Sequence, residues 1–302
     1  MSLLALLATG AGAPITPDLD PVRAAIVAQL DPANYGGRVF TVGTDHATVL
    51  GTVALADAAS SPGNWSLVLI PPGTYAERLE RPKVLLGQEA YTDICSTTLD
   101  PADVVITPPS GTDDTLEHHG IGGIVAGITF CGVGGYSAIH SGDWGKPYDF
   151  IYYKVRAEQL GTNAAFSFGT GPEQNVYAYD CVFHGADGGV FGHNFKDEVI
   201  GAYAHPSRAV FDNCAVTGVE VPKTAWHMPC FDSGQADEFY IKGGSIDGPL
   251  IFPLGVGETA STYIGGIDPA ITSTVSIAPE IGITRTLPAE LPTPARLAAW
   301  LA

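Results

Sequence analysis

Acidic, histidine and tryptophan side chains gather at three places in this sequence. Asp143, Trp144 and Asp149 combine an aromatic ring that can stack on a sugar with carboxylates that bind hydroxyls or attack a glycosidic bond. Trp226 and His227 lie in a later aromatic-rich segment and offer a similar surface. We therefore take these five residues as carbohydrate-binding candidates. The alternative for Trp144 is a turn held by one anchored tryptophan.

The third group is His118 and His119, which follow Asp113, Asp114 and Glu117. These residue types bind metal ions, but their spacing closes no recognised ligand set. A polar surface loop is the expected structure here, and we expect no metal ion and no other cofactor. The sequence also lacks a Gly-x-Ser-x-Gly motif, a phosphate-binding loop and a dinucleotide-binding fingerprint.

The elements that would hold these residues repeat along the chain. Residues 176–185 alternate apolar and other side chains, then have a small or polar break, an apolar residue and a glycine. The pattern recurs at 123–132, 209–218 and 239–248, and residues 151–157 fit one more copy loosely. Aligning the copies gives one apolar column, Phe130, Phe183, Val216 and Ile246, and one glycine column, Gly132, Gly185, Gly218 and Gly248. Repeats of short strands with no room for a helix predict a solenoid.

Two helices and a tail flank the repeats. Asp20 and Pro21 predict the start of a helix over 21–30, which we expect to cap the open end of the solenoid. A second helix is expected over 48–59, and a short amphipathic helix after the prolines of 291–294. The predicted domains are an arm and capping helix (1–37), a repeat domain (38–285) and a linker with a C-terminal helix (286–302). Segments 161–175, 188–207 and 220–235 are expected to be loops.

Composition narrows the classes of partner. Only 15% of residues are charged, whereas Gly (37) and Pro (23) are abundant, which favours strands and turns. The net charge of −18 argues against nucleic acid and anionic lipid as partners. The five cysteines form no Cys-x-x-Cys pair, and we expect buried thiols, with Cys181 and Cys214 in adjacent turns of the solenoid. A disulfide is the alternative.

Several segments resemble pectin methylesterases and related pectin-lyase-like proteins. They are Leu-Val-Leu-Ile-Pro-Pro-Gly-Thr-Tyr-Ala-Glu (67–77), Pro-Lys-Val-Leu-Leu-Gly (82–87), Gly-Ile-Thr-Phe (127–130), Tyr-Asp-Cys-Val-Phe-His-Gly (179–185) and Phe-Asp-Asn-Cys-Ala-Val-Thr-Gly (211–218). The resemblance covers roughly residues 38 to 250. It implies an all-β fold, a right-handed parallel β-helix with short capping helices near both termini.

The resemblance also implies a catalytic set, which this chain matches incompletely. The family uses two aspartates, glutamine donors for the oxyanion and an arginine. Here Asp187 stands where the acid/base aspartate is expected, but Ala186 replaces the glutamine. The next repeat offers Glu220 in place of the nucleophilic aspartate, and no arginine occurs between Arg208 and Arg285. Asp187 is therefore the one weak catalytic candidate, and a turn aspartate is the alternative.

Together these features favour a non-enzymatic structural or attachment protein of a virion, such as a bacteriophage tail protein that binds a cell-surface glycan. Its partners would be other subunits, contacted through the N-terminal arm and the C-terminal helix, in a homo-oligomer with a trimer favoured. Residues 1–13 are read as part of the arm, with a signal peptide and secretion as the alternative, and we expect no membrane span. The alternative function is a polysaccharide-active enzyme, a pectinesterase-like esterase or a lyase. A glycan-binding module without catalysis is a third.

Overall fold

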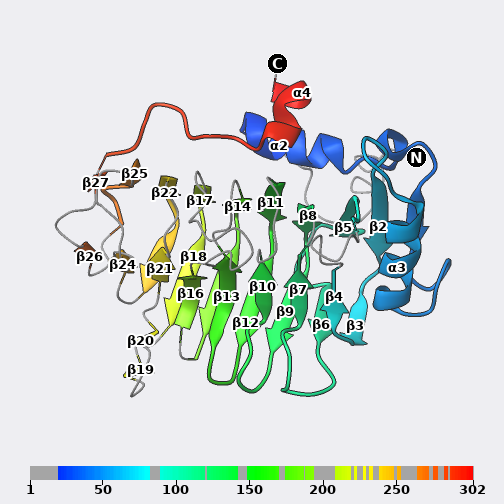
Figure 1. The fold of residues 1–302 in the computed structure, drawn as a ribbon, viewed down its shortest axis with the longest axis horizontal. Coiled ribbons are helices and arrows are strands. Elements are labelled where there is room, and N and C mark those ends of the chain that lie inside the picture. Colours follow the sequence, from blue (N-terminus) through cyan, green and yellow to red (C-terminus); the bar gives the residue numbers. More distant parts are fainter. Residues whose placement is uncertain are drawn as a thin grey trace, which may run out of the picture.

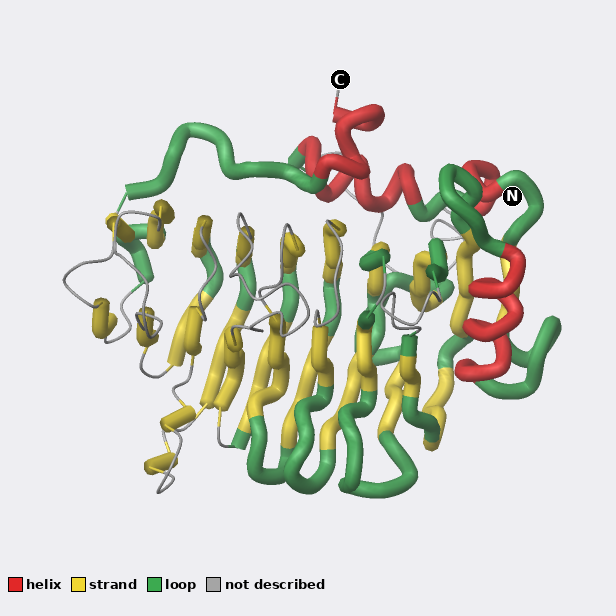
Figure 2. The backbone as a smooth tube through the Cα atoms, viewed as in Figure 1, coloured by secondary structure: helices red, strands yellow, loops and turns green. Residues whose placement is uncertain are grey.

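The chain winds into a parallel β-helix (Figures 1 and 2). The computed structural model describes residues 20–81, 89–119, 121–141, 148–169, 174–186, 188–193, 208–218, 221–222, 227–228, 231–233, 238–247, 250–252, 264–271, 275–277, 282–284 and 286–301. The solenoid predicted from the repeats, and the parallel strands with short helices near the termini that the family resemblance implies, are confirmed.

Three parallel sheets run along the solenoid, and successive turns contribute one strand to each. The ten-stranded sheet contains β1 (Val39–Thr41), β2 (Ser66–Ile70), β5 (Thr92–Ser96), β8 (Gly123–Ala126), β11 (Tyr148–Tyr153), β14 (Gln174–Tyr179), β17 (Arg208–Asp212), β22 (Glu238–Lys242), β25 (Ile264–Ile267) and β27 (Gly282–Thr284). The seven-stranded sheet contains β3 (Gly73–Ala76), β6 (Val104–Thr107), β9 (Thr129–Gly132), β12 (Arg156–Gln159), β15 (Val182–Gly185), β18 (Ala215–Gly218) and β23 (Ser245–Asp247).

The eight-stranded sheet is the one that the sequence patterns did not reveal. It contains β4 (Leu79–Glu80), β7 (Leu116–His118), β10 (Ile139–Ser141), β13 (Ala164–Gly169), β16 (Gly188–His193), β21 (Phe231–Ser233), β24 (Leu250–Phe252) and β26 (Val275–Ile277). Strands β13, β16 and β21 lie inside the segments expected to be loops, which corrects that expectation. A two-stranded antiparallel ladder joins β19 (Val221–Pro222) to β20 (His227–Met228).

The apolar column read from the sequence is a true column in space. The aligned Cα partners run Phe130, Ala157, Phe183, Val216 and Ile246, so the loosely fitting copy contributes Ala157. All five side chains belong to the hydrophobic core. In the glycine column, Gly132, Gln159, Gly185 and Gly218 are aligned.

The polar break in each repeat is a corner of the solenoid. Where the chain turns from the ten-stranded to the seven-stranded sheet, the backbone is left-handed at Gly127 (φ 66°), Lys154 (50°), Asp180 (54°), Asn213 (57°) and Gly243 (60°), and in the last of these corners also at Gly244 (75°). Gly, Asn and Asp tolerate this conformation best, which explains the small or polar residue at most of these positions. The corners also bond to one another, because the Asn213 side-chain amide donates to Asp180 at 2.7 Å.

Helix α3 (Val49–Ala59) covers the N-terminal end of the solenoid (Figure 1). Its buried face, Val49, Val53 and Ala56, joins the same hydrophobic core as Val68 and Ile70 of β2. The expectation that the first helix caps this end is therefore wrong. Helix α2 (Pro21–Gln29), which is N-capped by Asp20 as predicted, lies along the outer face of the ten-stranded sheet instead.

The reason for this placement is that the outer face of the ten-stranded sheet is itself apolar and needs a cover. Ile26 and Leu30, from α2 and its C-cap, share a buried cluster with Tyr153 and Tyr177 of that sheet. Arg23 of α2 donates to Asp180 at 2.8 and 2.9 Å, and it also bonds Asp212 at 3.2 Å. These bonds tie the helix to two neighbouring corners.

The C-terminal segment returns over α2 to the first turns of the solenoid (Figure 1). It ends in a 3-10 turn, η4 (Ala295–Leu297), and a single helical turn, α4 (Ala298–Leu301), where a short amphipathic helix was predicted. Arg296 pairs with the fully buried Asp93, and its guanidinium lies 3.4 Å from the ring centroid of Trp65. Cys181 and Cys214 are buried free thiols in adjacent turns, as predicted. Cys95 is also buried, Cys131 is only partly buried, and Cys230 lies outside the described residues.

We expect Arg23→Met to lower the free energy of unfolding by about 3 kcal/mol, because it leaves two largely buried carboxylates without their guanidinium. Burial alone would raise the pKa of Asp180, but the bonds from Arg23 and Asn213 outweigh it and lower that pKa. The Arg23 contribution is thus present at neutral pH and shrinks as the pH falls through the pKa of Asp180 in the folded protein.

Urea unfolding at several pH values measures both effects. The matched control is Arg156→Met, since the Arg156 side chain is 45% exposed and its pair with Glu158 should contribute less than about 1 kcal/mol. Equal losses in the two variants would contradict the role assigned to Arg23.

Candidate functional site

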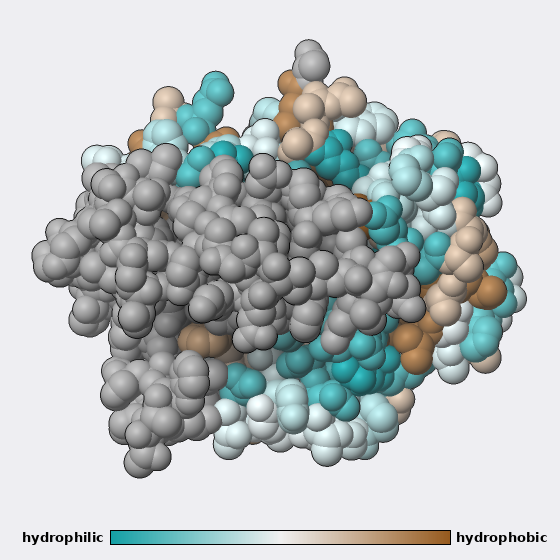
Figure 3. All heavy atoms as spheres, viewed as in Figure 1, coloured by the Kyte–Doolittle hydropathy of each residue, from teal (hydrophilic) through white to brown (hydrophobic). Residues whose placement is uncertain are grey.

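A row of polar side chains lies on the outer face of the eight-stranded sheet. Leu79, Leu116, Ile139 and Phe166 occupy aligned positions on β4, β7, β10 and β13 and point into the core. Neighbours along a strand point to opposite faces, so the next residues of these strands point outward. They form the aligned row Glu80, Glu117, His140 and Ser167. Figure 3 shows hydrophilic residues gathered over β4 and β7.

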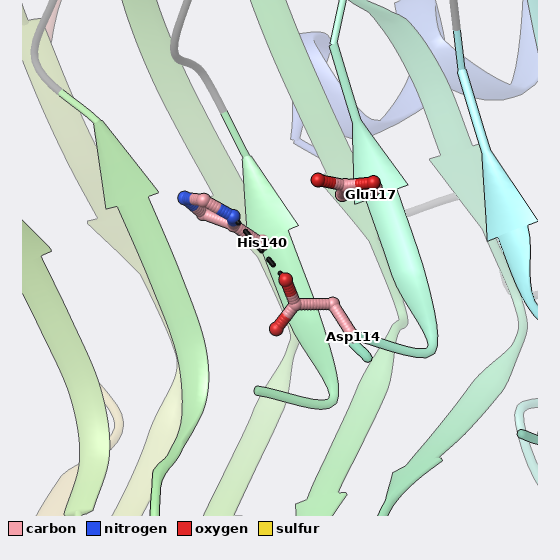
Figure 4. A group of neighbouring side chains, drawn as sticks. All are labelled: Asp114, Glu117 and His140. Carbon is pink, nitrogen blue, oxygen red and sulfur yellow. Dashed lines mark ion pairs between the residues drawn. The ribbon is translucent and has the colours of Figure 1, made fainter. Parts of the chain in front are cut away.

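Two members of this row, Glu117 and His140, each form an acid–histidine contact with a residue outside it. The Asp114 Oδ2 atom is 3.3 Å from His140 Nδ1, and Glu117 Oε1 is 3.1 Å from His119 Nε2. These side chains are 11%, 19%, 13% and 1% exposed, so the surroundings screen their charges only weakly. The two histidine rings lie 5.9 Å apart, centroid to centroid. Figure 4 shows Glu117 and His140 on adjacent strands, with Asp114 beside them on the turn that precedes β7.

The protein holds both carboxylates from behind. The backbone N–H of Ser137 donates to Asp114 Oδ1 at 2.6 Å. Arg78 donates to Glu117 Oε2 at 2.5 Å, and it also lies within 3.4 Å of Glu80 and 3.6 Å of Asp113. Each carboxylate of the acid–histidine pairs is thus oriented by a donor on one oxygen and turned towards a histidine with the other.

One donor atom from each of Asp114, Glu117 and His140 lies within 4.8 Å of the other two. An imidazole and two carboxylates at this separation suit either of two tasks, the activation of water by a base or the binding of a divalent cation. In the described part of the chain this is the cluster that has the side chains for both tasks.

The expectation of a polar surface loop at His118 and His119 is wrong. His118 ends strand β7 and points into the core, where its Nδ1 lies 2.9 Å from the Tyr152 hydroxyl. Burial, and the nearby Arg81, lower the pKa of His118 well below its usual value, so its ring is neutral at neutral pH. His118 is thus a core residue, and the partly exposed side chains of the site are Asp114, Glu117 and His140, with His119 buried behind Glu117.

His140 was not singled out from the sequence. It lies one turn of the solenoid after Glu117, and Leu116-Glu117-His118 aligns with Ile139-His140-Ser141. Both segments alternate an inward apolar side chain with an outward polar one. Recognising this short repeat, which lies between copies of the longer one, would have placed the two residues side by side.

The carbohydrate-binding candidates are largely untested. Asp143, Trp144, Asp187 and Trp226 lie outside the described residues. His227 lies on β20, opposite Pro222, in the small antiparallel ladder. Asp149 lies on β11 of the ten-stranded sheet and accepts a hydrogen bond at 3.0 Å from Asn175, its aligned partner on β14. That bond links two turns of the solenoid, and Asp149 is on a different sheet from His140.

No protein-family model matches the sequence, and no curated protein matches it. Among solved structures, pectin methylesterase from carrot is 15% identical, with 83% of this chain and 88% of that chain covered and a TM-score of 0.47. Pectin methylesterase from Aspergillus niger is 14% identical, with 87% and 96% covered and a TM-score of 0.40. The rice weevil enzyme is 12% identical, with 80% and 65% covered and a TM-score of 0.34.

The bond between Ser137 and Asp114 makes Asp114 a structural residue as well as a site residue. We expect Asp114→Ala to lower the free energy of unfolding by about 1–3 kcal/mol, because the buried Ser137 N–H loses its acceptor. Asp114→Asn keeps an oxygen there and should cost less. Urea denaturation compares them, with Asp113→Ala as the control because that side chain is 46% exposed. Equal stability of the Ala and Asn variants would contradict the bond.

Proposed function

We propose that this protein is a hydrolase that cleaves ester groups on a polysaccharide at the outer face of its eight-stranded sheet. The observation that carries the proposal is the partly buried Asp114–His140 pair, with Glu117 beside it on the neighbouring strand. This function corresponds to the enzyme that the sequence offered as its alternative. It uses residues other than those that the family resemblance implied.

The pair is suited to take a proton from water. Imidazole changes protonation near neutral pH, which makes it the side chain best matched to this task. A hydrogen on His140 Nδ1 that is donated to Asp114 leaves Nε2 as the proton acceptor. Water that loses its proton to Nε2 attacks the ester carbonyl, and the imidazolium then returns the proton to the departing alcohol. The products are the free acid and the alcohol.

A saccharide polymer is the substrate class that the shape and charge of the chain favour. Neighbouring strands of a sheet are about 4.8 Å apart, so the outer row presents polar groups at regular intervals along a rigid surface. The net charge of −18 repels polyanions but not a polymer whose acidic groups are esterified. The same repulsion would favour release of the acidic product. The sequence resemblance to pectin methylesterases supports the same substrate class.

We expect His140→Gln to lower the rate of ester hydrolysis about 100-fold or more, because general-base catalysis usually contributes that much. The measurement is acid release, titrated at constant pH, from methyl-esterified galacturonan, from an acetylated xylan and from a soluble aryl acetate. The control is His184→Gln, which removes an exposed histidine from the seven-stranded sheet, where it bonds Thr217 at 2.6 Å.

Two results would overturn this assignment. Absence of hydrolysis of all three substrates by the wild-type protein would refute the enzyme. Loss of activity in Asp187→Asn together with full activity in His140→Gln would move the site to the residue indicated by the family resemblance.

A second candidate function is the virion structural or attachment protein expected from the sequence, and exposed apolar side chains favour it. Leu50 and Leu55 of α3 are 45% and 43% exposed, and Trp300 of α4 is 43% exposed. Figure 3 shows hydrophobic atoms over α3. These side chains offer contacts for other subunits, in a trimer or on a particle surface, although Leu297 of the C-terminal turn is buried within this chain.

In the described residues no helix has the length and apolar character needed to span a membrane.

Light scattering of the purified protein tests this second function. A stable trimer that dissociates when Leu50 and Leu55 are replaced by Ser would support it. A monomer at all concentrations, with esterase activity, would contradict it.

A further inference from the structure

We propose that Asp114, Glu117 and His140 bind one divalent transition-metal ion, and that Zn²⁺ is the ion these ligand types favour. The donor atoms come from adjacent strands β7 and β10 and from the turn before β7, and they lie within 4.8 Å of one another (Figure 4). The inference deepens the proposed function, on which it rests only for the chemical role of the ion. The binding itself is independent of any substrate.

The donors are already oriented as ligands usually are. In metal sites, groups behind the ligands fix the direction of each carboxylate and imidazole. Here the Ser137 N–H fixes Asp114 through Oδ1, and Arg78 fixes Glu117 through Oε2. The second oxygen of Asp114, Oδ2, lies 3.3 Å from Nδ1 of the proposed ligand His140. Because one donor atom from each of the three ligands already lies within 4.8 Å of the other two, a metal ion needs little rearrangement of these side chains.

The charge of the cluster favours a cation. In the described structure the Arg78 guanidinium is shared by three carboxylates, those of Glu80, Asp113 and Glu117. A fourth carboxylate, that of Asp114, lies beside His140. Partial burial of Asp114 and Glu117 strengthens the attraction of both carboxylates for a divalent ion.

The ligand types distinguish between ions. Calcium and magnesium prefer oxygen ligands alone, whereas an imidazole beside carboxylates is typical of Zn²⁺ and its neighbours in the first transition series. Three protein ligands are the number found in catalytic zinc sites, where water takes the fourth position. His119 lies 3.1 Å from Glu117 Oε1 and is placed to orient that ligand.

The ion would supply one thing to ester hydrolysis, a bound water molecule with a pKa near 7. Asp114, Glu117 and His140 would hold the ion, so His140 would act as a ligand and not as a free base. Chelation therefore separates the two descriptions. A base made of the Asp114–His140 pair works without metal, whereas a zinc-bound nucleophile does not.

The test is isothermal titration of the chelator-treated, full-length protein with Zn²⁺ in the absence of substrate. We expect one ion per chain and binding at least about 100-fold weaker in Asp114→Asn, Glu117→Gln and His140→Gln, since even changes behind the ligands usually cost 10–100-fold. His184→Gln is the matched control and should bind as the wild type does. Circular dichroism checks that each variant is folded, and Glu117→Gln keeps the test valid if a change at Asp114 prevents folding.

Cobalt substitution and calcium titration define the site further. Bound Co²⁺ should give visible absorption without a thiolate charge-transfer band, which excludes binding at the cysteines.

No binding of Zn²⁺ at millimolar concentration, or binding that is unchanged in all three ligand variants, would overturn the site. Equal affinity for Ca²⁺ would overturn the choice of ion. Hydrolysis by a protein that binds no zinc would overturn this inference and leave the proposed function intact. Zinc binding without hydrolysis of any ester would overturn the proposed function and leave the metal site intact.

Discussion

Alignment of successive turns is the constraint on which the rest of this structure depends. Each strand bonds to the strand one turn earlier and one turn later, so neighbours in space lie 18 to 41 positions apart in the described strands, from Ile264 and Gly282 to Val190 and Phe231. A slip of one residue would turn every side chain of a strand to the opposite face. The polar row and the apolar column therefore depend on one register.

Left-handed corners and stacked aromatic rings hold that register. Asp180 and Asn213 occupy equivalent corners and bond to each other, which fixes where each turn leaves the ten-stranded sheet. Inside, Phe166 and Phe183 stack with centroids 4.9 Å apart, joining the eight-stranded and seven-stranded sheets across the core. Such pairs add to the free energy of burial, and their bulk leaves little freedom for a shifted strand. The polar row that contains Glu117 and His140 lies on the same strands and is therefore held rigid as well.

Two buried or partly buried arginines play a comparable part outside the core. Arg23 ties α2 to the corners of two turns, and Arg296 brings the C-terminal segment back to Asp93 near the first turns. Both cover the apolar outer face of the ten-stranded sheet. That face is thereby closed by the chain itself, whereas the described outer face of β7 and β10 presents acids and histidines. In the described residues the two outer faces thus differ in chemistry: the apolar one is covered by α2 and the C-terminal segment, and the polar one carries the acid–histidine cluster.

The sequence by itself determined the repeat. The alternation of side chains, the polar corner and the glycine after each strand depend on local geometry, and they predicted a solenoid with a core column through Phe130 and Phe183. The family resemblance added that its strands are parallel. Other local signals predicted the helix capped by Asp20 and the buried thiols of Cys181 and Cys214. The limits of local patterns also explain the wrong predictions. Strands β7 and β10 are three residues long, too short for their alternation to stand out, and so His118 and His119 were taken for a surface loop.

Only the tertiary structure decided which polar residues meet. Asp114 and His140 are 26 positions apart and become neighbours because one turn of the solenoid has about that length. The length of each turn includes a loop, and the sequence pattern does not predict how long that loop is. The position of α2 along the side of the solenoid, and not over its end, depends on an apolar outer face assembled from several turns. The acid–histidine contact and the position of α2 both depend on how successive turns align. That alignment cannot be deduced from any single segment of the chain.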